Sequence, residues 1–217
     1  MFSKTEFNSD ISMWDVSGVK NMGHMFEQNR FFQHNISNWD VSNVTNMSYM
    51  FYYSRFNQDI SEWNVSNVTN MKSMFNRSEF NTNISKWVVS NVKNMSHMFD
   101  DAAFNNDISC WDVSAVTDMS WMFATSLFNY DISKWDVSAV TDMDGMFFAS
   151  RFNQDISRWD VSNVRKMDNM FKYSSFDSNI SNWNTSKVIS SINIFDYCNI
   201  KEKNKPKKFQ IKDSIDL

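Results

Sequence analysis

The sequence is poor in glycine, proline and cysteine. Only three of its 217 residues are Gly and one is Pro, which excludes collagen-like chains and disordered Gly-rich or Pro-rich segments. The scarcity of Gly also excludes β-helices of the calcium-binding nonapeptide type, because these need glycine in every turn. Two cysteines, Cys110 and Cys198, cannot form a framework of several disulfides, and they do not share one place in the repeat, so they form no cysteine ladder.

Concentrated positive charge and long apolar runs are also missing. The net charge is −4; residues 201–217 carry six Lys against three acidic residues, which leaves −7 for the rest of the chain. Nucleic-acid binding needs a basic stripe, so we expect no nucleic-acid partner. No apolar run approaches membrane-spanning length, and residues 1–14 contain no apolar core of a signal peptide. The sequence as given predicts no membrane span and an intracellular or virion-associated protein.

The chain does contain a strict period of tryptophan. Eight of its nine Trp are 25 residues apart once and then 24 apart six times: Trp14, Trp39, Trp63, Trp87, Trp111, Trp135, Trp159 and Trp183. A fixed period of this size is typical of repeat proteins, in which each repeat buries its apolar face against its neighbours. The period therefore predicts one stacked array of eight repeats.

Each repeat has two parts, of which the third copy is a clear example. Residues 57–61 predict a short parallel strand. Apolar residues from Val68 to Phe75, followed by Ser78, have the i, i+3, i+6, i+7, i+10 spacing of one helix face, and Ser66 is positioned to cap such a helix. The sequence predicts an α/β repeat solenoid, a leucine-rich-repeat-like right-handed coil with one short parallel strand and one helix per 24-residue repeat.

Three segments follow from this pattern. Residues 1–6 align with the end of a helix and form a partial repeat, residues 7–200 form the eight-repeat solenoid, and residues 201–217 form a basic linker followed by a tail or a capping strand. For Phe209 and Ile211, a closing strand and a loose tail are both consistent with the sequence. No polar cap precedes the first repeat, so self-association through residues 1–14 is a further expectation.

The repeat resembles a known family. The run from Phe56 to Phe75, FNQDISEWNVSNVTNMKSMF, is similar to the repeat of about 25 residues in BspA-type leucine-rich-repeat surface proteins, a domain of unknown function. The resemblance covers about residues 1–200. It implies a leucine-rich-repeat-like fold, a location at the cell surface and a role in adhesion or protein binding. It supplies no catalytic residues.

No catalytic or metal-binding pattern interrupts the repeat, so we expect neither an enzyme nor a cofactor. Met-x-x-Met pairs such as Met71 and Met74 could bind copper(I), but their spacing favours a place in the core. His24, His34 and His97 do not have metal-ligand spacing. A nucleophile–base pair and a phosphate loop are both lacking.

An acidic row is one candidate site. These carboxylates precede the inward Ile of their repeats, where they should point outward: Asp10, Asp59, Asp107, Asp131 and Asp155. They could bind a basic partner or a cation. Alternatively, they and the Asn residues at the same position could bond their own backbone and support turns.

Outward aromatic residues are the second candidate site. Tyr49, Tyr52 and Tyr53 cluster in one repeat, and Tyr130 projects from a predicted strand. Trp121 and Phe148 occupy outward positions in adjacent repeats, so we expect them to be neighbours. Aromatic patches are typical anchors of protein interfaces, although single exposed aromatic residues are common.

The functional expectation is a non-catalytic scaffold for protein–protein interaction or adhesion, with an unidentified protein as its partner. Two alternatives are a structural component that assembles through its N-terminal end and a glycan-binding adhesin, for which exposed Tyr and Trp would suit sugar stacking.

Overall fold

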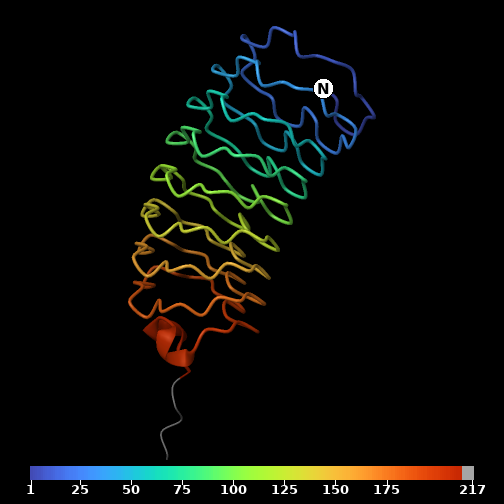
Figure 1. Ribbon diagram of the computed structural model, residues 1–217. Helices are drawn as coiled ribbons and strands as arrows, with labels where there is room; N and C mark the ends of the chain where they lie inside the picture. Colours follow the sequence, from blue (N-terminus) through green and yellow to red (C-terminus); the bar gives the residue numbers. More distant parts are fainter. Residues whose placement is uncertain (212–217) are drawn as a thin grey trace, which may run out of the picture.

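The chain winds into similar coils that are stacked in the order of the sequence. This is a computed structural model, and it describes residues 1–211. Each 24-residue repeat forms one coil, and the coils follow one another from the N-terminal end to the C-terminal end (Figure 1). The period in the sequence therefore corresponds to one turn of the chain around a common core.

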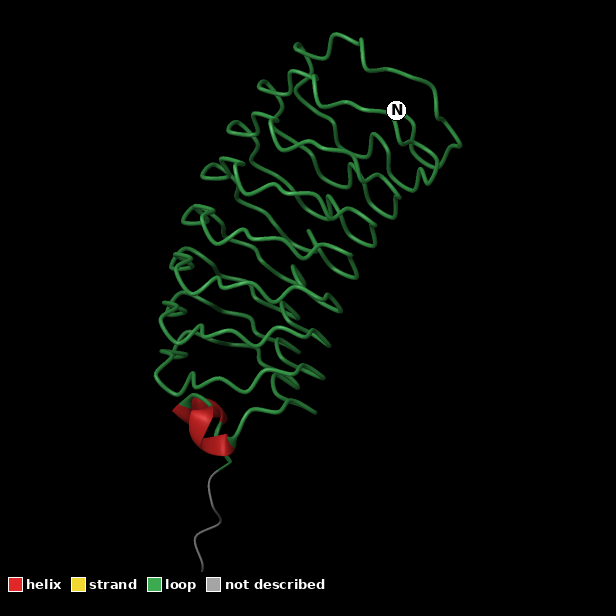
Figure 2. Ribbon diagram, viewed as in Figure 1, coloured by secondary structure: helices red, strands yellow, loops and turns green. Residues whose placement is uncertain are grey.

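Regular secondary structure is almost absent from these coils. Within residues 1–211, the helices are two short 3₁₀ helices, η1 (Glu202–Asn204) and η2 (Lys207–Phe209), and β-structure is limited to isolated parallel bridges between successive coils (Figure 2). The prediction of one strand and one helix per repeat is therefore wrong, and with it the leucine-rich-repeat-like α/β fold class. The coils consist of turns and extended segments instead.

The segments predicted as helices use their backbone to join neighbouring coils. In the third repeat, alternate N–H groups donate to alternate carbonyls of the next coil at 2.8–3.0 Å: Met71 to Asn94, Ser73 to Ser96, Phe75 to Met98 and Arg77 to Asp100. A helix would need these N–H groups for carbonyls four residues earlier in the same segment. The ladder between coils therefore excludes the helix.

Two tight turns replace each predicted helix. In the third coil the N–H of Met74 donates to Met71 O at 3.1 Å, and the N–H of Ser78 donates to Phe75 O at 3.2 Å. The third residue of each turn, Ser73 and then Arg77, has a positive φ of 54° and 56°, as type II turns require. A positive φ costs an L-residue about 1–2 kcal/mol, which the ladder must offset.

The residues predicted as helix caps and strands have other roles. Ser66 caps no helix; its N–H donates to Asn64 Oδ1 at 3.2 Å and closes a side-chain turn. In the predicted strand region, the N–H of Asn81 donates to the side-chain oxygen of Asn57 in the preceding coil at 2.8 Å. Side-chain oxygens thus satisfy backbone groups that a sheet ladder would otherwise pair.

The predicted core rows are confirmed. The inward Met and Phe of the central coils are fully buried, and their Phe rings stack along the array, as in Phe51–Phe75 with centroids 5.8 Å apart. The Phe that begins the following repeat packs on the first, as in Phe51–Phe56 at 4.2 Å. Burial of these rings supplies the main cohesion between coils.

Seven of the periodic tryptophans also hydrogen-bond across the stack. Each indole Nε1–H donates to the carbonyl of the inward Ile in the preceding coil, as in Trp87 to Ile60 O at 3.1 Å. The indole is buried, with Trp87 only 3% exposed. The Trp row therefore both fills the core and adds an indole hydrogen bond at every junction from Trp39 to Trp183, to an Ile carbonyl that also accepts the backbone N–H of the Trp three residues after it.

Residues 201–210 pack against the last coil. The N–H of Ile180 donates to Asn204 O at 2.9 Å, and Phe209 lies edge-on to Phe195 at 6.0 Å. Phe209 ends η2, so the closing strand, one of the two alternatives for Phe209 and Ile211, does not form. Residues 212–217 lie outside the described part of the chain. Within residues 1–211 no helix has the length and apolar character needed to cross a membrane.

Candidate interaction surface

The paired turns of all eight coils form one outward surface, here called the turn face. It consists of the outward side chains of residues 21–28, 46–53, 70–77, 94–101, 118–125, 142–149, 166–173 and 190–197. The inter-coil ladder places equivalent positions beside one another along the stack. Side chains far apart in the sequence are thereby held in rows on a rigid backbone.

Trp121 and Phe148 are neighbours on this face, as the sequence predicts, although turns rather than helices carry them. Their ring centroids are 5.3 Å apart with an interplanar angle of 48°. Trp121 lies directly against Gly145 of the next coil, where a Cβ atom would be only 2.4 Å from Trp121 Cδ2. Gly145 also has a φ of +59°. The missing side chain of Gly145 thus creates the seat for the indole.

The pair belongs to a longer aromatic row. His97 stacks on Trp121 at 6.0 Å, Phe148 meets Tyr173 edge-on at 5.8 Å, and Tyr173 stacks on Tyr197 at 4.9 Å. Tyr173 is 51% exposed, whereas Trp121 and Phe148 are half-buried. These five residues, the aromatic row, span the fourth to eighth coils and present a continuous ring surface to solvent.

The predicted tyrosine cluster lies nearer the N-terminal end of the same face. Tyr49 stacks on His24 at 4.8 Å and contacts Tyr52 edge-on at 5.8 Å, while the Arg30 guanidinium lies over Tyr53 at 5.1 Å. Tyr130 belongs to neither group: it is exposed beside Phe128, outside the turn-face segments. The structure therefore divides the six predicted aromatic residues into a pair, a cluster and a single residue.

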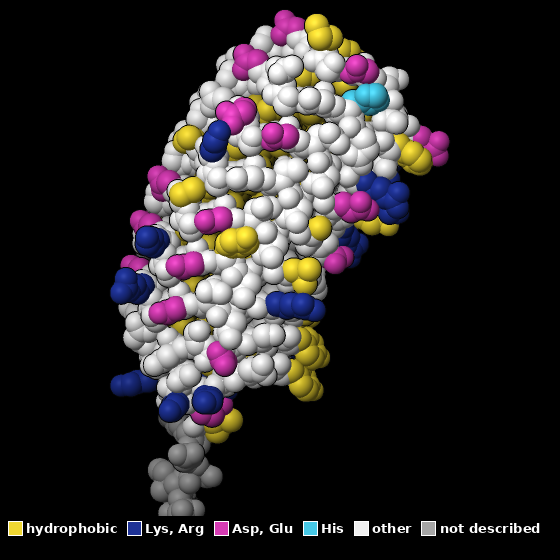
Figure 3. Space-filling view, in the orientation of Figure 1, with side chains coloured by type: hydrophobic (Ala, Val, Ile, Leu, Met, Phe, Trp, Pro, Cys, Tyr) yellow, Lys and Arg dark blue, Asp and Glu magenta, His cyan; other side chains and the backbone are white. Residues whose placement is uncertain are grey.

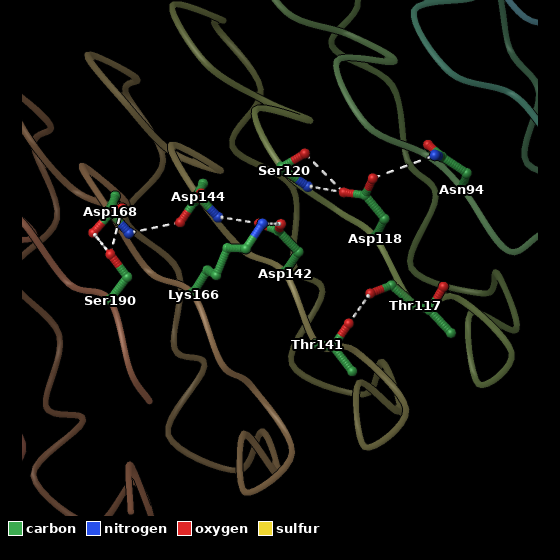
Figure 4. Close-up of polar contacts among 10 residues, drawn as sticks. All are labelled: Asn94, Thr117, Asp118, Ser120, Thr141, Asp142, Asp144, Lys166, Asp168 and Ser190. Carbon is green, nitrogen blue, oxygen red and sulfur yellow. Dashed lines mark hydrogen bonds and ion pairs between the residues drawn. The ribbon is translucent and has the colours of Figure 1, made fainter. Parts of the chain in front are cut away.

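Figure 4 shows four carboxylates of the turn face, in the two coils that carry the aromatic pair and in the coil that follows. Asp118, Asp142, Asp144 and Asp168 come from three successive coils and belong to a polar ladder rather than standing alone. Asp118 accepts from the Ser120 N–H at 3.0 Å, and Asp142 pairs with Lys166 at 2.8 Å. No residue in the acidic row predicted from the sequence belongs to this group.

The environment of Asp144 shifts the pKa of its carboxyl. Burial raises the pKa of Asp144 above its ordinary value, while the backbone N–H of Asp168, which donates to Asp144 at 2.8 Å, lowers it. The negative charges of Asp142 and Asp168 raise the pKa further, and Lys166 opposes them. Burial and the two neighbouring carboxylates therefore disfavour the charged form of Asp144, the residue directly before Gly145.

The predicted acidic row makes turn contacts within its own repeats. In each case a carboxylate oxygen accepts the backbone N–H of the Ser two residues later at 2.8–2.9 Å, in Asp10, Asp59, Asp107, Asp131 and Asp155. The backbone hydrogen bond lowers the pKa of each carboxyl, helped by the Ser side chain. The Asn residues at this position make the same contact. A partner or cation at this row stays a prediction.

Two structural features were missed from the sequence. One is an asparagine ladder, in which each side-chain oxygen accepts the backbone N–H of the equivalent residue in the next coil: Asn57, Asn81, Asn105, Asn129 and Asn153. Their recurrence directly after an inward Phe was the available signal. The other is Gly145, one of the three glycines. It is the only Gly at this turn position in the eight coils, and the coil before it has Trp121 at the same position.

The exposed surface is mixed in chemistry. On the face shown in Figure 3, acidic side chains are spread from one end of the stack to the other, with hydrophobic side chains in small groups between them. Within residues 1–211, no group of three or more His, Cys, Asp or Glu is arranged to hold a metal ion. Self-association through residues 1–14 stays a prediction, since none of these contacts tests it.

Comparison with known proteins identifies a repeat family. The family model described as "Mycoplasma protein of unknown function, DUF285" matches residues 1–105, 53–127 and 102–209. These overlapping matches cover nearly the whole array. No curated protein and no solved structure matches the chain.

Proposed function

The chain belongs to the DUF285 family of repeat proteins, and we propose that it is a non-catalytic scaffold that binds another protein on its turn face. The observation that carries the proposal is the seating of Trp121 against Gly145 with Phe148 beside it. Large aromatic side chains held in one position lose little entropy on binding, which is characteristic of interface anchors.

The charge around the pair indicates the chemistry of the partner. Asp118 lies three residues before Trp121, the N–H of Trp121 donates to the backbone carbonyl of Asp144 at 2.7 Å, and Lys166 is paired with Asp142. A partner surface with Lys or Arg around an apolar contact would complement this arrangement, and Arg would also stack on the rings. A closer relationship to BspA-type surface proteins, with a role in adhesion at a cell surface, is the finer form of the same proposal.

An affinity pull-down from a lysate of the source organism tests the proposal. The wild type is compared with the double variant Trp121→Ala/Phe148→Ala and with Tyr130→Ala, a matched aromatic control outside the turn face. We expect one stoichiometric partner with the wild type and the control, and its loss with the double variant. Melting temperatures must stay close to that of the wild type, because both side chains are only half-buried.

Two results would contradict this proposal. Equal capture of the partner by the double variant would remove the aromatic pair from the interface. Recovery of only the protein itself, together with a mass that rises with concentration, would favour the alternative of a self-assembling structural component.

A further inference from the structure

The turn face has a hollow where its aromatic positions are interrupted. Tyr49 and His97 occupy the same turn position in the second and fourth coils, and the coil between them has Ser73 there. The hollow is lined by Tyr49 and Tyr52 on one side, His97 on the other, and Ser73 and Asn76 in the coil between them. Tyr49 and His97 are about 10 Å apart at two strand spacings.

The separation between Tyr49 and His97 is large enough for one more ring to stack between them. Where rings are present at consecutive turn positions, their centroids are 4.8 Å apart for His24 and Tyr49 and 6.0 Å apart for His97 and Trp121. One flat group between Tyr49 and His97 would therefore contact a ring on each side at the spacing of the row.

Asn76 supplies an independent sign of a ligand. Its side chain is 8% exposed, and its Oδ1 has no hydrogen-bond partner among the described residues. A buried acceptor without a donor costs about 1–3 kcal/mol, so native structures rarely keep one without a reason. The oxygen is turned away from solvent, and a ligand hydroxyl in the hollow would donate to it once the Asn76 amide turns to present its oxygen to the hollow.

The lining also favours a neutral, hydroxyl-rich ligand. Glu27 and Lys72, which line the hollow as well, carry opposite charges, so the site selects neither an anion nor a cation. An aromatic side chain of a partner would prefer a more apolar lining than Lys72, Ser73 and Asn76 provide. A pyranose ring has apolar C–H faces for the electron-rich faces of Tyr49 and His97 and hydroxyls for the amide and the ammonium.

We propose that the hollow over Ser73 and Asn76 is a binding subsite for one neutral pyranose unit of a saccharide. The unit lies between Tyr49 and His97 and donates a hydroxyl to Asn76 Oδ1. This site adjoins the protein contact proposed at Trp121 and Phe148 through the stacking of His97 on Trp121. The two proposals are tested by different substitutions and different probes, so either can fail while the other stands.

Saturation-transfer NMR with defined probes tests the subsite. The probes are methyl α-mannopyranoside, methyl β-glucopyranoside and methyl N-acetyl-β-glucosaminide, with N-acetyl-tryptophanamide as an aromatic comparator. We expect millimolar binding of at least one glycoside, with transfer strongest to its ring C–H protons, and no competition from the comparator.

Three variants locate the binding. Ser73→Tyr fills the hollow with a residue that Tyr49 shows to be compatible with this turn position at φ 58°, and we expect it to abolish binding. Asn76→Ala, which copies Ala124 at the equivalent position, removes the acceptor; we expect affinity to fall about five- to tenfold with stability unchanged or increased. Asn169→Tyr introduces Tyr at the same turn position as Ser73→Tyr but outside the hollow, and it should bind the glycosides like the wild type.

The proposal is overturned if none of the glycosides binds, or if Ser73→Tyr, folded as judged by its melting temperature, binds as well as the wild type. Binding of N-acetyl-tryptophanamide in place of the glycosides would also overturn it and assign the hollow to an aromatic side chain of a protein partner.

Discussion

Replacing Gly145 with Ala tests how the turn face holds Trp121. The new Cβ would lie 2.4 Å from Trp121 Cδ2, so the indole must leave its seat. The φ of +59° adds about 1–2 kcal/mol of backbone strain for an L-residue. Loss of the aromatic packing adds about 1 kcal/mol. We therefore expect Gly145→Ala to lower the free energy of unfolding by about 2–3 kcal/mol.

A double-mutant cycle separates the two contributions. In a Trp121→Ala background the indole is gone, so Gly145→Ala should cost only the backbone strain, and the coupling energy should be about 1 kcal/mol. Ala149→Gly is the matched control for strain, because Ala149 has a φ of 50° in the same coil; we expect it to stabilise by about 1 kcal/mol. Urea denaturation followed by tryptophan fluorescence measures all four variants, provided that the m-values agree.

The loss of unfolding free energy caused by Gly145→Ala, measured with and without the Trp121 indole, shows whether Gly145 acts as a seat for the indole. An equal cost with and without the Trp121 indole would show that Gly145 is needed only for its backbone conformation. The seat for the indole, and with it the preorganised anchor, would then be refuted.

Three further predictions concern the ladders. Trp87→Phe removes the indole hydrogen bond to the Ile60 carbonyl, which keeps the N–H of Trp63 as a donor, and should cost about 1 kcal/mol in urea denaturation; an unchanged midpoint would contradict it. Asn105→Leu removes the acceptor for the next coil and should cost about 1 kcal/mol, whereas Asn105→Asp keeps an acceptor and should cost less. Because their folded pKa is lowered, Asp59 and Asp107 contribute stability above the ordinary carboxyl pKa and lose it as pH falls through the folded value; Asp59→Asn/Asp107→Asn should therefore flatten the acid side of the melting-temperature profile.

The period and the core could be read from the sequence because burial depends on side-chain chemistry alone. Trp63, Met71 and Phe75 recur at fixed spacing and are buried as predicted. The spacing of apolar residues does not, however, distinguish a helix from successive turns. Met71 and Met74 are the first and last residues of one turn, and this i, i+3 relation puts them on the same side, as a helix would.

The conformation of the backbone depends on partners that are about 24 residues away. The N–H of Ser73 is bonded to Ser96, and that bond stabilises a positive φ that a serine avoids in isolation. Local propensity does not include such a distant partner, so the helix prediction failed although the inward Met and Phe of the central coils were correctly assigned. For the same reason the contact of Trp121 with Phe148 was predictable from register, whereas its seat on Gly145 was not.

Side-chain ladders also determine which outward residues remain for recognition. Asn57, Asp59 and their equivalents hold backbone groups of their own or the next coil, so a substitution there alters the stack itself. The side chains at the turn position of Ser73, Trp121 and Gly145 do not hold backbone groups of the stack. They range from a single hydrogen to an indole, although the φ angles at this position are nearly the same. A binding surface requires side chains that differ in shape on a backbone whose conformation stays the same. Under both proposals, recognition depends on the arrangement of rings and gaps along this position.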